Sequence, residues 1–128
     1  MARKATKKRT VHLTDRALRD IVDIESFSID KFGERVAAQY VRKLEAGIRR
    51  IADNPDLLRE ELPFHDSLKF YRIEQHLLVC ETAIVGRIIV LSLLHSSMDI
   101  PSRLAELEPK LLLETEMLVN HLSRLSKS

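Results

Sequence analysis

The fold of this chain is constrained most by one almost unbroken apolar segment, residues 87–95, which reads RIIVLSLLH. A strand that is wet on one face alternates apolar and polar residues, whereas a continuous apolar run indicates a strand covered on both faces. Periodicity alone also fits a buried helix, but three successive β-branched residues and the preceding Gly86 favour a strand. We therefore predict a central strand over residues 87–95, which the rest of the chain covers and flanks.

Length and composition indicate one domain with a mostly aliphatic core. The chain has 128 residues, of which 45% are hydrophobic, 31% charged and only 5% aromatic, as expected of a globular protein. The single Cys80 excludes an internal disulfide and is typical of a reducing compartment. No apolar run reaches the roughly 18–20 residues of a membrane span, and the N-terminus lacks the apolar stretch of a signal peptide. We expect a cytoplasmic protein that does not contact membranes.

The net charge of +2 hides an uneven distribution along the chain. Residues 1–10 carry five Lys and Arg side chains and no acid, so the other 16 Lys and Arg face 19 Asp and Glu. The part after the tail is therefore slightly acidic, which argues against a broad nucleic-acid footprint on the fold itself. A solvated tail over residues 1–9 explains the basic start more simply than contact with an acidic partner.

Local signals predict a first strand over residues 10–13 and then an antiparallel helical hairpin. Thr14 or Asp15 can cap the first helix, which ends at Gly33, and the second helix runs from Glu34 to Asn54-Pro55. Both segments repeat apolar residues at helical spacing, and the stripe of the first helix includes Phe27 and Phe32. Five cations lie off the apolar stripe of the second helix; a solvated surface explains them more simply than a basic face for a nucleic acid or an acidic partner. They are Arg35, Arg42, Lys43, Arg49 and Arg50.

The second half of the chain predicts three strands and a final helix. Residues 68–73 and 77–81, joined by a turn over 74–76, precede the central strand and form an antiparallel meander with it. Strand, helical hairpin and meander make an α+β fold, in which the helices cover one face of a curled sheet. A Leu-rich segment follows from about residue 102, either as one helix or as two pieces hinged near Pro109.

This order of elements resembles the ParE branch of the RelE/ParE superfamily, the toxins of bacterial type II toxin–antitoxin pairs. Four segments carry the resemblance, which covers roughly residues 10–104. They are VHLTDRALRDIVDI, FGERVAAQYVRKLEAGIRRIADNP, LKFYRIEQHLLVCET and GRIIVLSLLHSSMD. The chain extends past the family pattern at both ends, through the basic tail and about two dozen C-terminal residues. We therefore divide it into a tail over 1–9, a toxin domain over 10–103 and a helical extension over 104–128.

The resemblance implies a cognate antitoxin and a cellular target. ParE-like members inhibit DNA gyrase without catalysis, whereas RelE-like members cleave mRNA on the ribosome. A member that has lost toxicity would persist as a binding module. No cofactor is implied. We expect gyrase inhibition, keep the RelE-like endonuclease as the alternative, and leave open whether the chain is an enzyme.

Cleavage of RNA by its own 2′-hydroxyl needs an acid, a base and cations for the phosphorane. The candidates are Arg72, Arg87 and His95, but Arg87 and His95 are about 26 Å apart along an extended strand. They share a face only if the strand has no bulge, and Lys69 and Tyr71 lie on the face opposite Arg72. Such spacing does not suit one scissile phosphate.

Partner contacts are predicted on the sheet and on the C-terminal helix. The candidates are Lys69, Tyr71, His95, Asp99, Leu111, Leu118 and Leu122. His95 and Asp99 recur in the ParE-like pattern, although a buried strand end and a helix cap explain them more simply. The C-terminal leucines predict packing on the toxin's own groove or a homodimer. The scattered histidines lack metal-ligand spacing, and Cys80 reads as core.

Overall fold

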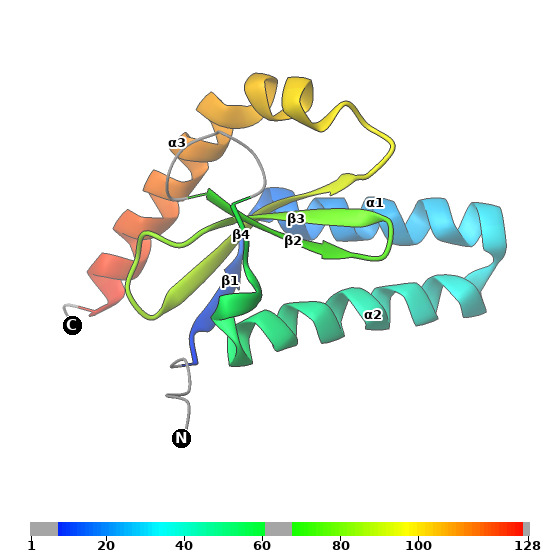
Figure 1. Cartoon of the computed structure of the whole chain (residues 1–128), viewed down its shortest axis with the longest axis horizontal. Coiled ribbons are helices and arrows are strands. Elements are labelled where there is room, and N and C mark those ends of the chain that lie inside the picture. The colour runs from blue at the N-terminus through cyan, green and yellow to red at the C-terminus, as the bar shows by residue number, and fades with distance from the viewer. Residues whose placement is uncertain (1–7, 61–67, 127–128) are drawn as a thin grey trace.

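The computed structural model describes residues 8–60 and 68–126, with the backbone alone for residues 108, 109, 111, 112, 115, 119 and 122–126. Its elements follow in the predicted order (Figure 1). They are β1 (Thr10–Leu13), α1 (Asp15–Phe32), α2 (Glu34–Asp53), a 3-10 turn (Pro55–Leu57), β2 (Leu68–Ile73), β3 (His76–Glu81), β4 (Arg87–His95) and α3 (Ile100–Ser126). The α+β class and the helical hairpin are confirmed. The predicted loop over 56–67 lies partly outside the described residues.

The four strands form one mixed sheet in the order β1-β4-β3-β2. The segment over residues 87–95 is an inner strand, as its composition predicted, and seven of its nine residues are buried. β2, β3 and β4 form the antiparallel meander, whereas β1 pairs with β4 in parallel. The turn between β2 and β3 is shorter than predicted, because His76 already pairs with both Ile73 and His95.

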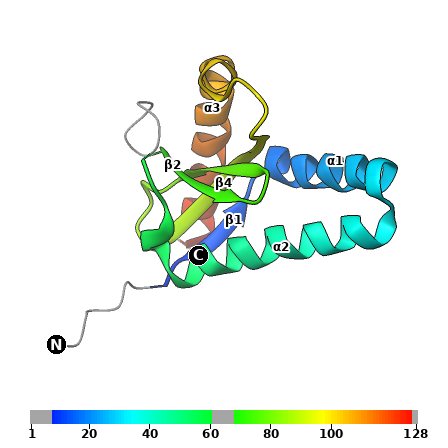
Figure 2. The same cartoon turned by 45° about the vertical axis from the view of Figure 1, so that its right-hand side comes forward.

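Local capping defines the helical hairpin. Thr14 has extended backbone angles, and its Oγ1 accepts a hydrogen bond from the Ala17 N–H at 3.1 Å, which satisfies a donor that a first turn leaves free. Gly33 joins α1 to α2 with a φ of 90°, a conformation that favours glycine. The two helices lie side by side and extend past the end of the sheet (Figures 1 and 2). Phe27 and Phe32, predicted for the apolar stripe of α1, are therefore exposed.

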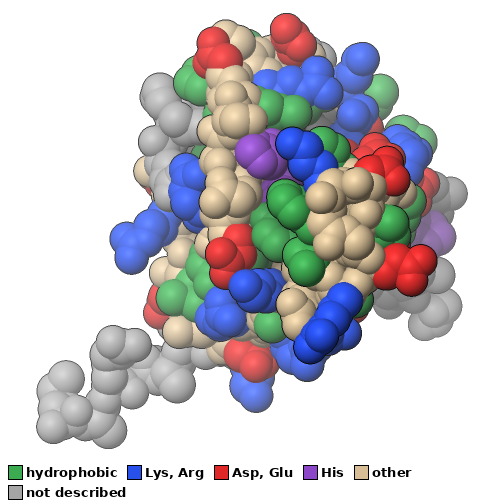
Figure 3. Space-filling view, turned by 90° about the vertical axis from the view of Figure 1, so that its right-hand side faces the viewer, with side chains coloured by type: hydrophobic (Ala, Val, Ile, Leu, Met, Phe, Trp, Pro, Cys, Tyr) green, Lys and Arg blue, Asp and Glu red, His purple; other side chains and the backbone are tan. Residues whose placement is uncertain are grey.

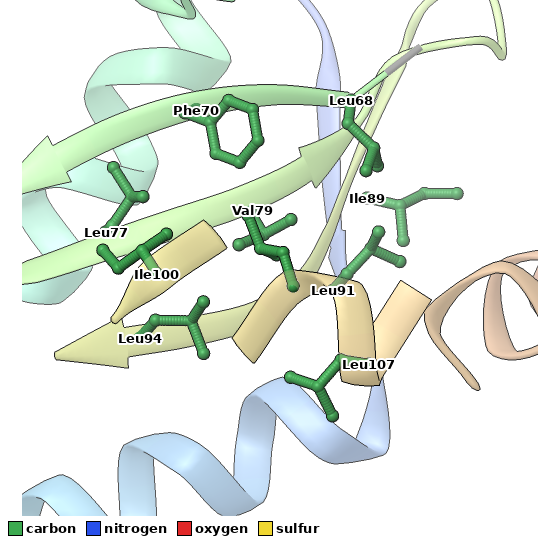
Figure 4. Close-up of a cluster of buried hydrophobic side chains, with 10 residues drawn as sticks. Leu68, Phe70, Leu77, Val79, Ile89, Leu91, Leu94, Ile100 and Leu107 are labelled. Atoms are coloured by element: carbon green, nitrogen blue, oxygen red, sulfur yellow. The ribbon is translucent and has the colours of Figure 1, made fainter. Parts of the chain in front are cut away.

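Each face of the sheet has its own hydrophobic core. On one face, Ala17 of α1 and Leu44 and Ile51 of α2 pack against alternate residues of β3 and β4. On the other face, Ile100, Leu104 and Leu107 of α3 cover the remaining set. The side chains of this second core are drawn in Figure 4. With both faces covered, an apolar central strand has no wet side, which explains its continuous composition.

A β-bulge in β4 changes which residues face each core. Val79 pairs with Ser92 but Cys80 pairs with Val90, so Leu91 is an extra residue in β4. Before it, Ile88 and Val90 belong to the core under the helical hairpin. After it, the alternation is reversed. Leu93 belongs to that core, whereas Leu91 and Leu94 belong to the core under α3.

α3 is a single helix that runs through Pro109 and begins at Ile100, four residues before the expected extension. Asp99 precedes it and accepts hydrogen bonds from the Ser102 hydroxyl at 2.8 Å and from the Ser102 N–H at 3.4 Å, in the manner of a helix cap. In α3, Glu114 forms an ion pair with Arg16 of α1 at 2.8 Å. Within the described part of the chain, no helix is long and apolar enough to cross a membrane.

Candidate functional site

An apolar groove of about 610 Å³ lies where the helical hairpin extends past the end of β4. Phe27, Phe32 and Val36 line it from the hairpin, and Met98 lines it from the segment after β4. Phe27 is 58% exposed and Phe32 is 61% exposed. Figure 3 looks at this end of the molecule, where hydrophobic side chains and a histidine are surrounded by charged ones. A concentration of exposed apolar side chains of this kind marks a binding surface.

The strand end beneath the groove is held by two side chains of the first helix region. β1 pairs only with residues 87–90 of β4, so the next residues of β4 lack a neighbouring strand on that edge. The Thr14 hydroxyl donates to the Leu91 carbonyl at 2.9 Å. Asp20 accepts hydrogen bonds from the Ser92 hydroxyl at 2.7 Å and from the Leu93 N–H at 3.0 Å. These hydrogen bonds give the backbone groups at the bulge their partners and fix the direction in which β4 approaches the groove.

Tyr40, His76 and His95 form a polar cluster at the groove. The Gln75 N–H donates to the Tyr40 hydroxyl at 3.1 Å, and Tyr40 Oη lies 2.6 Å from His76 Nδ1. The imidazole rings of His76 and His95 meet edge to face with centroids 5.1 Å apart. The Ser97 N–H donates to His95 Nδ1 at 3.0 Å. This bond, and the Tyr40 hydroxyl beside His76, favour the neutral tautomer with the proton on Nε2 in both rings.

Burial keeps His76 and Tyr40 uncharged near neutral pH. Desolvation, assisted by the neighbouring His95, lowers the pKa of His76 to about 4. Burial also raises the pKa of the Tyr40 hydroxyl, a rise that the Gln75 hydrogen bond opposes and the charge of Glu74 assists. A general acid or base works best with a pKa near the operating pH. His76 is therefore suited to binding, as a neutral polar surface, rather than to proton transfer at pH 7.

The candidate ribonuclease residues do not converge. Arg72, near the end of β2, lies on the α3 face of the sheet, as does its partner Leu77. His95 follows Leu93 on the hairpin face, at the same end of the sheet. Arg87 lies at the opposite end of β4, and the bulge puts it on the face opposite His95. The condition under which Arg87 and His95 would share a face, an unbulged strand, is not met.

The predicted partner-binding residues are distributed over several surfaces. Lys69 and Tyr71 share the hairpin face of β2, where Lys69 forms an ion pair with Glu60, and the Tyr71 hydroxyl accepts a hydrogen bond from Arg50 at 2.9 Å. Leu118 is partly buried against the core beneath α3. The side chains of Leu111 and Leu122 lie outside the described residues. Of the predicted residues whose side chains the structure describes, only His95 lines the groove.

Sequence reasoning missed most of the groove. Phe27 and Phe32 fit an apolar helix stripe, and nothing in their spacing shows that the sheet ends before it reaches them. Tyr40 and His76 come from elements 36 residues apart in the chain. The sequence held one signal for the polar cluster, because a histidine beside an apolar strand needs a hydrogen-bond partner.

The described residues contain no group of three or more His, Cys, Asp or Glu side chains that could hold a metal ion. Cys80 is fully buried in β3, and burial raises the pKa of its thiol far above the ordinary value. A thiol needs its thiolate form to react. The described part of the chain thus gives no basis for metal or thiol chemistry.

Comparison with known proteins identifies the class and then the family. A family model described as "ParE toxin of type II toxin-antitoxin system, parDE" matches residues 11–100, and the strand, hairpin and meander in this span define a toxin fold of the RelE/ParE superfamily. Since the match covers well over half of its length, the chain belongs to the ParE toxin family of type II toxin–antitoxin systems.

Three individual proteins are similar to this chain to different degrees. "Toxin ParE" of Escherichia coli is 29% identical over 94 residues, which are 73% of this chain and 91% of that protein. A solved structure described as the chromosomal ParDE system from P. aeruginosa has a TM-score of 0.59 at 14% identity, over 69% of this chain and 96% of that one, and shares the fold. The toxin–antitoxin complex RelBE2 from Mycobacterium tuberculosis has a TM-score of 0.49 at 16% identity, over 73% and 97% of the two chains.

Proposed function

We propose that this chain is a toxin that binds and inhibits DNA gyrase and that a cognate antitoxin neutralises it. The observation that carries the proposal is the ParE family match over residues 11–100. The groove adds physical support, because it combines exposed phenyl rings with the polar side chains of Tyr40 and His76 and suits the apolar face of a partner segment.

The separation of Arg72, Arg87 and His95 favours this proposal over ribosome-dependent mRNA cleavage. In-line attack requires the acid, the base and the stabilising cations within hydrogen-bond reach of one phosphate. Two of these side chains lie on opposite faces of the sheet at one end, and the third lies at the other end. An mRNA endonuclease and a non-toxic binding module are therefore the two alternatives, and the experiment below distinguishes them from a gyrase inhibitor.

Pulse-labelling in bacteria within minutes of inducing this chain alone tests the proposal, together with a supercoiling assay of purified gyrase. We expect early loss of DNA synthesis with translation intact, and dose-dependent loss of supercoiling. The double variant Arg72→Ala/Arg87→Ala should keep both effects. Early loss of translation, relieved in that variant, would establish mRNA cleavage instead. Normal labelling of both polymers and unimpaired gyrase would leave a binding module.

The antitoxin is proposed to place an apolar side chain in the groove between Phe27, Phe32 and Met98. Phe32→Asp puts a charge into this exposed apolar wall and should weaken the complex with the antitoxin encoded beside this chain by at least about tenfold. Exchange of the exposed Val85, which lies in the loop before β4 and away from the groove, for Asp is the control. Equal affinity for both variants, measured by titration calorimetry, would place the antitoxin elsewhere.

A further inference from the structure

The outer surface of α2 carries three arginines in a regular line. Arg35, Arg42 and Arg49 are seven residues apart, and each comes two residues before a buried position of the same helix. Those buried positions are Ala37, Leu44 and Ile51. A step of two residues turns about 200° around an α-helix, so the arginines lie on the side of α2 opposite its buried face. We call these three residues the arginine ridge.

The guanidinium groups of the ridge are exposed and available. In the described part of the chain, none of the three takes part in a hydrogen bond or an ion pair. Their neighbours on the next line of the helix differ, because Lys43 forms an ion pair with Glu74 at 3.6 Å and Arg50 donates to Tyr71. The ridge therefore has three uncommitted charges, which Lys43 and Arg50 reinforce.

The ridge differs in composition from a protein-binding surface. Gln39, Glu45 and Ala46 separate its arginines and are exposed, so it offers no aromatic or large aliphatic anchor of the kind that dominates protein interfaces. At about 1.5 Å per residue, the arginines are about 10.5 Å apart over a straight line of about 21 Å. A regular row of planar, bidentate donors suits a repeating anion, and phosphates along a nucleic acid provide one.

We propose that the arginine ridge binds the phosphate backbone of duplex DNA without sequence preference. The slightly acidic charge of the fold does not oppose this, because the footprint is confined to one side of one helix. Glu45 is the single acid within residues 35–50, against five cations. Beyond the ridge, Asp53 lies 3.9 Å from Lys8 and is partly neutralised. The inference does not depend on the proposed function, because the ridge would bind free duplex DNA in the absence of gyrase.

Fluorescence anisotropy of the full-length chain with a labelled 20-base-pair duplex tests this proposal. The variant Arg35→Gln/Arg42→Gln/Arg49→Gln should bind at least about tenfold more weakly at low salt. The slope of log affinity against log salt should fall by about 3, because roughly 0.9 counterions are released per phosphate contact. The Lys version of the triple variant keeps the charge and should retain most of the binding.

A matched control separates the ridge from overall charge. Arg19, Arg59 and Lys110 are exposed and lie off α2, so their exchange for Gln removes the same charge elsewhere. This control should bind DNA with the wild-type salt slope. Equal weakening in the control would overturn the proposal, as would undetectable binding of the wild type at 50 mM salt. Ridge-dependent binding of a labelled poly-aspartate without binding of the duplex would also overturn it, in favour of an acidic protein.

Folding of each variant is checked by circular dichroism, and the single variants serve if the triple variant unfolds. A gyrase supercoiling assay on the same variants tests the proposed function independently of DNA binding. Loss of DNA binding with intact gyrase inhibition would uphold the ridge and show that inhibition does not use it. Intact DNA binding without gyrase inhibition would refute the proposed function alone.

Discussion

At the scale of single residues, Asp20 joins the helical hairpin to the open edge of the central strand. Its carboxylate accepts from the Ser92 hydroxyl and from the Leu93 N–H. Asp20→Ala leaves that partly buried N–H without a partner, so we expect a loss of about 1–3 kcal/mol in the free energy of unfolding. Urea denaturation measures it. Asp23→Ala, an exposed position one turn on, should change stability by less than about 0.5 kcal/mol.

His76 gives the protein a defined sensitivity to acid. Its pKa is about 4 in the folded state against 6.5 for the ordinary group, so the unfolded chain takes up a proton first as the pH falls. The stabilisation is complete above pH 6.5 and is lost towards pH 4, by at most about 3 kcal/mol. His76→Asn should flatten the dependence of unfolding free energy on pH over this range. An unchanged slope would refute the assignment, and the exposed His121→Gln serves as control.

At the scale of elements, α2 approaches the end of β2 through Gly47. A Cβ built at Gly47 would lie 2.2 Å from Cδ1 and 2.7 Å from Cγ1 of the buried Ile73. Gly47→Ala should therefore cost about 1–3 kcal/mol by overpacking, which outweighs its gain of about 1 kcal/mol in helix propensity. Thermal unfolding measures this cost.

A second substitution checks the mechanism of that loss. Ile73→Val removes Cδ1, the nearer of the two atoms, so Gly47→Ala should be less costly in the Ile73→Val background than alone. Additive effects of the two substitutions would mean that the contact between α2 and β2 does not set the cost.

Elements defined by local chemistry were predictable from sequence, and those defined by long-range pairing were not. Thr14 caps α1, Gly33 separates the helices and Asn54 ends α2, each through bonds or angles within a few residues. The parallel pairing of β1 with β4 and the hydrogen bond from Thr14 to the bulge residue Leu91 join residues more than 70 positions apart. No local pattern encodes such contacts.

The candidate site was likewise predictable where local sequence defines it and not where long-range contacts do. His95 was named from its place at the end of an apolar strand, and it lines the groove. The phenyl rings of Phe27 and Phe32 were read as core, because amphipathic spacing does not report where the supporting sheet ends. The cluster of Tyr40, His76 and His95 depends on a turn that brings β2 and β3 against α2. The neutral state of His76 could be deduced only once its burial was known.

At the scale of the whole molecule, α3 completes the fold by covering the second face of the sheet. Leu104 and Leu107 are buried in that core, whereas Leu118 is only partly buried. Truncation after residue 109 should therefore cost less stability than truncation after Arg103, which removes both buried leucines at about 2–5 kcal/mol each. Denaturation of the two truncated chains tests this order. Equal stability would show that α3 adds no core.

Light scattering tests the predicted homodimer with the same chains. Leu113 is 58% exposed and Met117 is 64% exposed on α3, so a dimer through this helix would involve them. The mass of the full-length chain should then fall to that of a monomer with Leu113→Glu/Met117→Glu. A monomeric wild-type chain would remove the homodimer from consideration.

The bulge at Leu91 divides β4 into two parts in which opposite sets of residues face the helical hairpin. Upstream of it, even-numbered positions face the helical hairpin; downstream, odd-numbered positions do. Deleting this one residue would join the two parts into a regular ladder, because Ser92, the partner of Val79, would then directly follow Val90, the partner of Cys80. His95 would keep its place at the groove, and the protein would lose the buried Leu91 side chain and the hydrogen bond from Thr14. The face of each residue in β4 is thus set by its partner in β3 and not by its position along β4.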